Sequence, residues 1–232
     1  MKVQFLPKEK IEAAAQNLLG GYRKKFGLEV DLPVPVEEIL ESFLGLNLEF
    51  DDLRKRLGVP DILGATWVRE RRVVIDQSLD PTEDPRKEGR YRFTIAHELG
   101  HWELHRHIFE GVPGQGVLFD DSPEPSIVCR SKSRKDPMEW QADAFAGCLL
   151  MPKGAMIEAW ESLNGTPEPY VAMSEIAEIF SRFGLNKNDQ PIVQVAWDLA
   201  TIFQVSGQAM QVRLTELGLI RLENASLDLF GR

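Results

Sequence analysis

The residues with the clearest capacity for chemistry are the four histidines, which all lie between positions 97 and 107. Two of them frame the pentapeptide His97-Glu98-Leu99-Gly100-His101, an H-E-x-x-H sequence that is typical of zinc metallopeptidases. On an α-helix, four residues turn about 400° and rise about 6 Å, so both imidazoles project from one face and can share a metal. Glu98 lies in the adjacent row, where a carboxylate can reach a metal-bound water without binding the metal. The motif predicts metal-assisted hydrolysis with Glu98 as the general base.

A catalytic zinc site typically takes three protein ligands, so a third ligand must come from elsewhere in the chain. His105 shares the helical face of His97 and His101, but it lies about 12 Å along the axis from His97 and cannot join both in one site. His107 has the spacing of the third histidine of metzincins. Those proteins place a glycine where this chain has Leu104, and without it a helix carries His107 about 600° past His101.

Glu139 is the stronger candidate for the third ligand. The segment from Glu139 to Asp143 has the E-x-x-x-D pattern with which gluzincins supply a third ligand and a supporting acid from a second helix. Asp143, one turn on, could accept the free N–H of a metal-bound imidazole and fix its orientation. Zinc suits two imidazoles and one carboxylate, and ligand type leaves manganese open as well.

Two helices and a small sheet must position these side chains. Apolar spacing predicts helices over residues 8–26, 36–44, 88–107 and 138–150, and β-prone stretches over 46–50, 64–68 and 72–75. Residues 110–137 are rich in proline, glycine and charge, apart from a β-prone stretch at 126–129 that could pair with a substrate backbone. We therefore expect an α+β fold with a zincin-like metallopeptidase core over residues 1–155 and a helical C-terminal module over 156–232.

The composition indicates the class of protein and the cellular compartment to expect. The chain has 232 residues, of which 43% are hydrophobic, and this is enough to fill a core. No apolar run approaches the roughly 18 to 20 residues that cross a bilayer, and the first ten residues lack the apolar stretch of a signal peptide. Cys129 and Cys148 do not form a disulfide framework. We expect a soluble, cytoplasmic protein whose net charge of −9 opposes binding to nucleic acid or membranes.

Taken together, the motifs resemble the ImmA/IrrE family of metallopeptidases. The resemblance rests on HELGH followed by EWQADAFAGCLLMP, and it extends back through LGATWVRERRVVIDQSL and forward to DLATIFQVSGQAMQVRLTELGLI. It implies His97, His101 and Glu139 as metal ligands and Glu98 as base, whereas Asp143 stands where many members have asparagine. It also implies a site-specific endopeptidase whose substrate is a helix-turn-helix repressor, often encoded nearby, and whose cleavage releases a phage, mobile-element or stress regulon.

Two other classes of function stay open from the sequence. The chain could be a regulator that binds a repressor or an antitoxin without cutting it and keeps the metal for structure. It could also bind DNA, because residues 198–220 have a helix-turn-helix pattern. Residues 191–232, however, contain three arginines, no lysine and four acids, so the basic surface of a DNA reader is missing. We expect this module to pack against the peptidase or hold a repressor.

Overall fold

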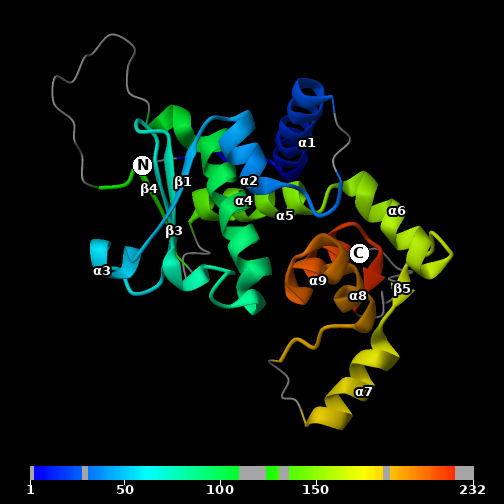
Figure 1. The fold of residues 1–232 in the computed structure, drawn as a ribbon. Helices are drawn as coiled ribbons and strands as arrows, with labels where there is room; N and C mark the ends of the chain where they lie inside the picture. The colour runs from blue at the N-terminus through cyan, green and yellow to red at the C-terminus, as the bar shows by residue number, and fades with distance from the viewer. Residues whose placement is uncertain (1–2, 28–30, 110–123, 131–135, 185–188, 223–232) are drawn as a thin grey trace, which may run out of the picture. The chain divides into compact units, whose positions relative to one another are not determined.

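The structure is a computed structural model that describes residues 3–27, 31–109, 124–130, 136–184 and 189–222 (Figure 1). The contacts within the chain divide it into two compact units, Met1–Leu150 and Met151–Arg232. The fold is mixed α and β, as the sequence predicts. Within the described ranges, no helix is both long and apolar enough to cross a membrane.

The first unit contains the helices and strands expected from the sequence, together with the short helix α3 and 3-10 helices that were not expected. In chain order they are α1 (Lys8–Phe26), α2 (Val36–Glu38), the π-helix η1 (Ile39–Phe43), β1 (Asn47–Asp51), α3 (Leu53–Leu57), β2 (Ile62–Trp67), β3 (Arg72–Asp76), the 3-10 helices η2 (Gln77–Leu79) and η3 (Pro85–Lys87), α4 (Glu88–His105), the 3-10 helix η4 (Arg106–Ile108), β4 (Ile127–Arg130) and α5 (Pro137–Leu150). The histidine motif lies on α4 and the E-x-x-x-D segment lies on α5.

The four strands form one mixed sheet in the order β1-β3-β2-β4. Strand β1 pairs with β3 in parallel, whereas β2 pairs antiparallel with both β3 and β4. Strand β4 is therefore at one edge of the described sheet, and its Cys129 lies opposite Gly64 of β2. Residues 110–123 and 131–135, which flank this strand in the chain, lie outside the described residues.

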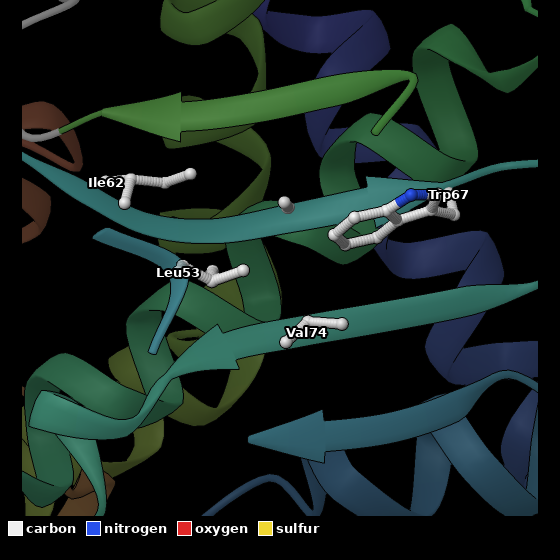
Figure 2. Packing of buried hydrophobic residues seen from close by; sticks show 5 residues of the cluster. Leu53, Ile62, Trp67 and Val74 are labelled. Atoms are coloured by element: carbon white, nitrogen blue, oxygen red, sulfur yellow. The ribbon is translucent and has the colours of Figure 1, made fainter. Parts of the chain in front are cut away.

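The two faces of β2 have different neighbours. One face joins a buried cluster under α3, formed by Leu53, Ile62, Ala65, Trp67 and Val74 (Figure 2). Gly64 and Thr66 alternate with Ala65 and face α4, since a Cβ on Gly64 would meet Glu98 and Thr94. Ile62 and Ala65 can share the cluster face because the pairing with β4 is irregular between Ile62 and Gly64, where two steps along β2 match one step along β4.

Helix α4 packs between the sheet and α5, and α1 packs on α5. The approach of α4 to α5 is close because Gly100 has no side chain. A Cβ at Gly100 would lie 3.0 Å from the Cα of Ala142 and 3.1 Å from its carbonyl oxygen. The glycine of the histidine motif thus brings the two site-bearing helices together.

Two helices differ from the expected spans. The helix expected over 36–44 is α-helical only to Glu38 and continues as a π-helix, in which the Leu44 N–H donates to the Ile39 carbonyl at 3.0 Å. Nine residues make too few turns for apolar spacing to separate the two helix types. The motif helix ends at His105, and His107 lies in a 3-10 turn.

The described part of the second unit contains helices and one two-stranded pairing. In chain order its elements are α6 (Lys153–Asn164), β5 (Tyr170–Val171), α7 (Met173–Phe183), α8 (Gln194–Phe203), α9 (Gly207–Glu216) and β6 (Ile220–Arg221). Strands β5 and β6 pair in parallel. Ser206 caps α9, because its hydroxyl accepts the Ala209 N–H at 3.1 Å.

Candidate metal centre

Three side chains from α4 and α5 converge on one point. The Nε2 atoms of His97 and His101 lie 2.9 Å apart. The carboxylate of Glu139 faces both rings, with one oxygen 3.5 Å from Nε2 of His97 and the other 3.2 Å from Nε2 of His101. All three residues are buried, and their ligand atoms form a group that could hold a metal ion.

The dimensions of this group fit a small transition-metal ion. Zinc bonds of about 2.0 to 2.1 Å at tetrahedral angles hold ligand atoms roughly 3.3 Å apart, and the three observed separations lie within about 0.4 Å of that value. Two imidazoles and one carboxylate are also a common donor set for zinc. The residues therefore fit such an ion in both spacing and chemistry.

Helix geometry explains why these residues meet. His97 and His101 are four residues apart on α4 and so project from the same face, and Gly100 brings α5 close to that face. Glu139 and Asp143 are likewise one turn apart on α5. Asp143 accepts a hydrogen bond from Nδ1 of His97 at 2.9 Å. The sequence-predicted residues are thus gathered in one cluster.

Glu98 lies beside the cluster in an environment that disfavours its charge. The Thr66 hydroxyl donates to its Oε2 at 2.6 Å, whereas Oε1 is buried and has no hydrogen-bond partner among the described protein atoms. Burial is the main reason that the pKa of Glu98 rises to about 7. One oxygen is therefore fixed by Thr66, and the other lies against Gly64 of β2 without a hydrogen-bond partner among the described protein atoms.

The charge state of Glu139 differs from that of Glu98. Burial opposes its ionisation, but hydrogen bonds from His101 and His97 outweigh this and lower the pKa of Glu139 to about 2. Burial also lowers the pKa of His101 to about 4. Glu139 is therefore ionised and His101 neutral at neutral pH, as metal binding requires. For His97, burial opposes the charge, but Cys129, Asp143 and Glu139 outweigh it and raise the pKa of this imidazole well above its usual range, so a metal ion would have to displace a proton from His97.

Several residues around the cluster were not indicated by any pattern in the sequence. Thr66 and Gly64 contact Glu98 from β2, and their only signal was their place in a predicted strand. Cys129 of β4 is buried, and its sulfur lies within 4.8 Å of ligand atoms of His97 and Glu98. His105, which spacing excluded as a ligand, is buried against His101, while His107 is exposed.

Comparison with known proteins places this chain in a family. The IrrE N-terminal-like domain family (Peptidase_M78) matches residues 48–215, which is well over half of the chain, so the protein belongs to this family. Membership supports a metal-dependent, peptidase-like role. Among solved structures, the chain is similar to a Mycobacterium tuberculosis transcriptional regulator, with 17% identity, a TM-score of 0.47 and coverage of 89% of this chain. The match covers 46% of that protein, so this chain spans less than half of its length. No curated protein matches the chain.

Proposed function

We propose that this protein is a metal-dependent endopeptidase whose active site is formed by α4 and α5. The single observation that carries the proposal is the convergence of the His97, His101 and Glu139 donor atoms within 3.5 Å of one another, beside the unpartnered oxygen of Glu98. Zinc is the expected metal, and manganese is an alternative with the same ligands. Around this site we propose a zincin-like core, made of the small sheet and the two helices.

The roles of the protein groups follow from their positions. His97, His101 and Glu139 would hold the metal, which when bound polarises the scissile carbonyl and promotes the ionisation of water. Glu98 accepts the proton of the attacking water at its free Oε1 and then delivers it to the leaving amine. In the metal-free protein, burial raises its pKa to about 7, which makes Glu98 a better proton acceptor than an exposed carboxylate. Thr66 holds the other carboxylate oxygen, so that Oε1 keeps its direction.

An extended substrate could bind along the sheet edge formed by β4. Strand β4 pairs with β2 on one side only within the described sheet. A peptide added alongside its other edge would place its backbone next to the strand that carries Cys129, close to Glu98. Pairing of this kind favours a segment of a protein chain over a small molecule. Binding of a protein segment in this way is what an endopeptidase requires.

We propose a helix-turn-helix transcriptional repressor as the substrate and the second unit as the part that holds it. The family resemblance suggests this substrate class. Helices α8 and α9 are separated by a short turn, and Ser206 in that turn caps α9, as in a helix-turn-helix unit. The acidic net charge of −9 favours contact with a basic protein over contact with DNA.

The test is incubation of the purified chain, loaded with zinc or manganese, with candidate helix-turn-helix repressors, followed by intact mass measurement. We expect two fragments whose masses sum to the repressor plus one water. The matched control is Glu98→Gln, which keeps the shape and the Thr66 contact but removes the base, and it should bind metal and leave the repressor whole. A repressor that binds tightly and stays intact with the wild-type protein would instead identify a non-cleaving regulator.

A further inference from the structure

A chain of hydrogen bonds leads away from the metal centre toward the N-terminus. Nδ1 of His101 lies 3.1 Å from Nδ1 of His105, whose Nε2 lies 3.1 Å from Oε1 of Gln141. The side-chain amide of Gln141 donates to the backbone carbonyl of Gln4 at 3.0 Å. His101, His105 and Gln141 are each at most 1% exposed. The chain is thus shielded from water over most of its length.

The chemistry of the groups gives this chain one direction. A metal on Nε2 of His101 leaves a proton on Nδ1, which must donate to His105. Nδ1 of His105 is then the acceptor, so its proton is on Nε2 and is donated to the Gln141 oxygen. The Gln141 amide nitrogen, in turn, donates to the Gln4 carbonyl, which can only accept. Every donor therefore points away from the metal, and each of the three hydrogen bonds pairs one donor with one acceptor.

We propose that His105 is a positioning residue for the metal ligand His101, and that Gln141 and the backbone of Gln4 hold His105 in the required tautomer. The segment before α1 thereby becomes part of the support of the metal centre. Its neighbour Phe5 stacks on Trp140 of α5 with ring centroids 5.8 Å apart, which is a second contact between this segment and α5. The inference rests on the metal centre of the proposed function, but it does not depend on peptide cleavage.

The two histidine ligands are supported in different ways. His97 is oriented by Asp143, a carboxylate whose side chain is 39% exposed, whereas His101 is oriented by a buried and neutral imidazole. When the partly exposed Asp143 side chain is removed, water can take its place as the acceptor for His97. A buried acceptor cannot be, because no solvent reaches Nδ1 of His101. Loss of His105 should therefore disturb its ligand more than loss of Asp143 disturbs His97.

The first experiment measures metal binding in the full-length protein and needs no substrate. Zinc affinity is measured by competition with a chelator, and ligand geometry by the visible absorption of the cobalt-loaded protein. His105→Leu removes the acceptor, and we expect a loss of zinc affinity of roughly 10- to 100-fold with a changed cobalt spectrum. His105→Gln offers an acceptor to His101 and a donor to Gln141, and it should recover most of the affinity. Ile95→Val, a buried α4 change without hydrogen bonding, should lower stability and leave the affinity unchanged.

A double-variant comparison separates a connected chain from independent structural effects. If Gln141 acts only through His105, adding Gln141→Leu to His105→Leu should cause no further loss of zinc affinity, although Gln141→Leu alone weakens binding. If the losses of zinc affinity in the two single variants add up in the double variant, the proposal is overturned. It is also overturned if the His105→Leu protein folds without metal and binds zinc as tightly as the wild type. Failure of the wild-type protein to bind zinc or cobalt would overturn the metal centre and this chain together. Normal binding without cleavage would overturn only the peptidase function.

Discussion

At the scale of single residues, the site separates two kinds of carboxylate by their surroundings. Glu139 is held ionised by two imidazoles, whereas Glu98 is buried with a single hydroxyl donor, and its pKa rises to about 7. A metal ligand must be charged to bind, and a group that takes up and releases a proton must lie near the working pH. The same functional group is thus assigned two roles by the atoms around it.

Gly64 determines the space that Glu98 occupies. A Cβ at this position would lie 2.6 Å from Oε1 and 3.0 Å from the Thr94 methyl, so Gly64→Ala must displace the carboxylate. The carboxylate is the end of a flexible side chain, and we expect the free energy of unfolding to change by no more than about 1 to 2 kcal/mol. Cleavage of the substrate should fall by about 100-fold because the base moves from its position. Kinetics at full metal occupancy would measure this, and an unchanged rate would contradict the placement of Glu98.

The pKa of Glu98 also predicts how stability depends on pH in the metal-free protein. Its folded-state pKa of about 7 lies above the ordinary 4.5, so the folded state holds the proton more tightly than the unfolded state. Stability from this group is present below pH 4.5 and is lost as the pH rises through 7. The loss is on the order of 3 kcal/mol at most.

Urea unfolding with a chelator present, at pH 5 and pH 8, would measure this effect. Glu98→Gln cannot ionise, so it should lose less stability over that interval than the wild-type protein. The other titrating groups are present in both proteins and cancel to first order in the comparison. Equal losses in the two proteins would show that Glu98 titrates normally.

The sequence predicted the reactive residues better than their surroundings. His97 and His101 were found because a helix converts a spacing of four residues into a shared face, and Glu98 because it lies in the adjacent row of the same motif. Gln4, Thr66 and Cys129 approach the site from segments far away in the chain, and no local pattern relates them to α4. Pairwise contacts of this kind depend on sheet register and helix packing, which become visible only in three dimensions.

At the scale of elements, the metal centre depends on the distance between α4 and α5. Gly100 faces the backbone of Ala142, and Gly100→Ala must push α5 away, since backbone atoms cannot rotate aside. We expect destabilisation of about 1 to 3 kcal/mol and a weaker zinc affinity, by about tenfold, because Glu139 moves with its helix. Chemical denaturation and chelator competition would measure the two effects.

Gly147 on α5 provides the matched control for this change. A Cβ there would meet nothing within 4 Å. Gly147→Ala should therefore leave zinc affinity unchanged and raise stability by up to about 1 kcal/mol through helix propensity. If both alanine variants bound zinc like wild type, the helix spacing would not control the centre.

At the scale of the whole molecule, the candidate site belongs to one of two compact units. The residues that would hold the metal, together with Glu98 and the hydrogen-bond chain to Gln4, all lie in Met1–Leu150. The second unit, Met151–Arg232, has its own buried residues, such as Trp160 and Phe203. Each unit therefore has the core needed to unfold as a separate cooperative step.

Calorimetry with and without metal tests this division. Free zinc at 100 times its dissociation constant should stabilise the first unit by about 2.7 kcal/mol, since only that unit binds it. We expect one of two thermal transitions to move upward with zinc and the other to keep its temperature. A single transition, or two that shift together, would show that the units are energetically coupled.

The irregular step in β2 between Ile62 and Gly64 has a consequence for how this sheet can change over evolution. In a regular strand, side chains alternate between the two faces of the sheet. An inserted or deleted residue therefore moves every later side chain to the opposite face. Here the extra residue resets the phase of the strand between its two halves. Ile62, before this step, can therefore point into the hydrophobic cluster. After the step, Gly64 and Thr66 face Glu98 on the other side of the sheet. Related sequences should therefore keep the extra residue between Ile62 and Gly64, because it decides which side chains of β2 face Glu98. The type of residue at that position should matter less.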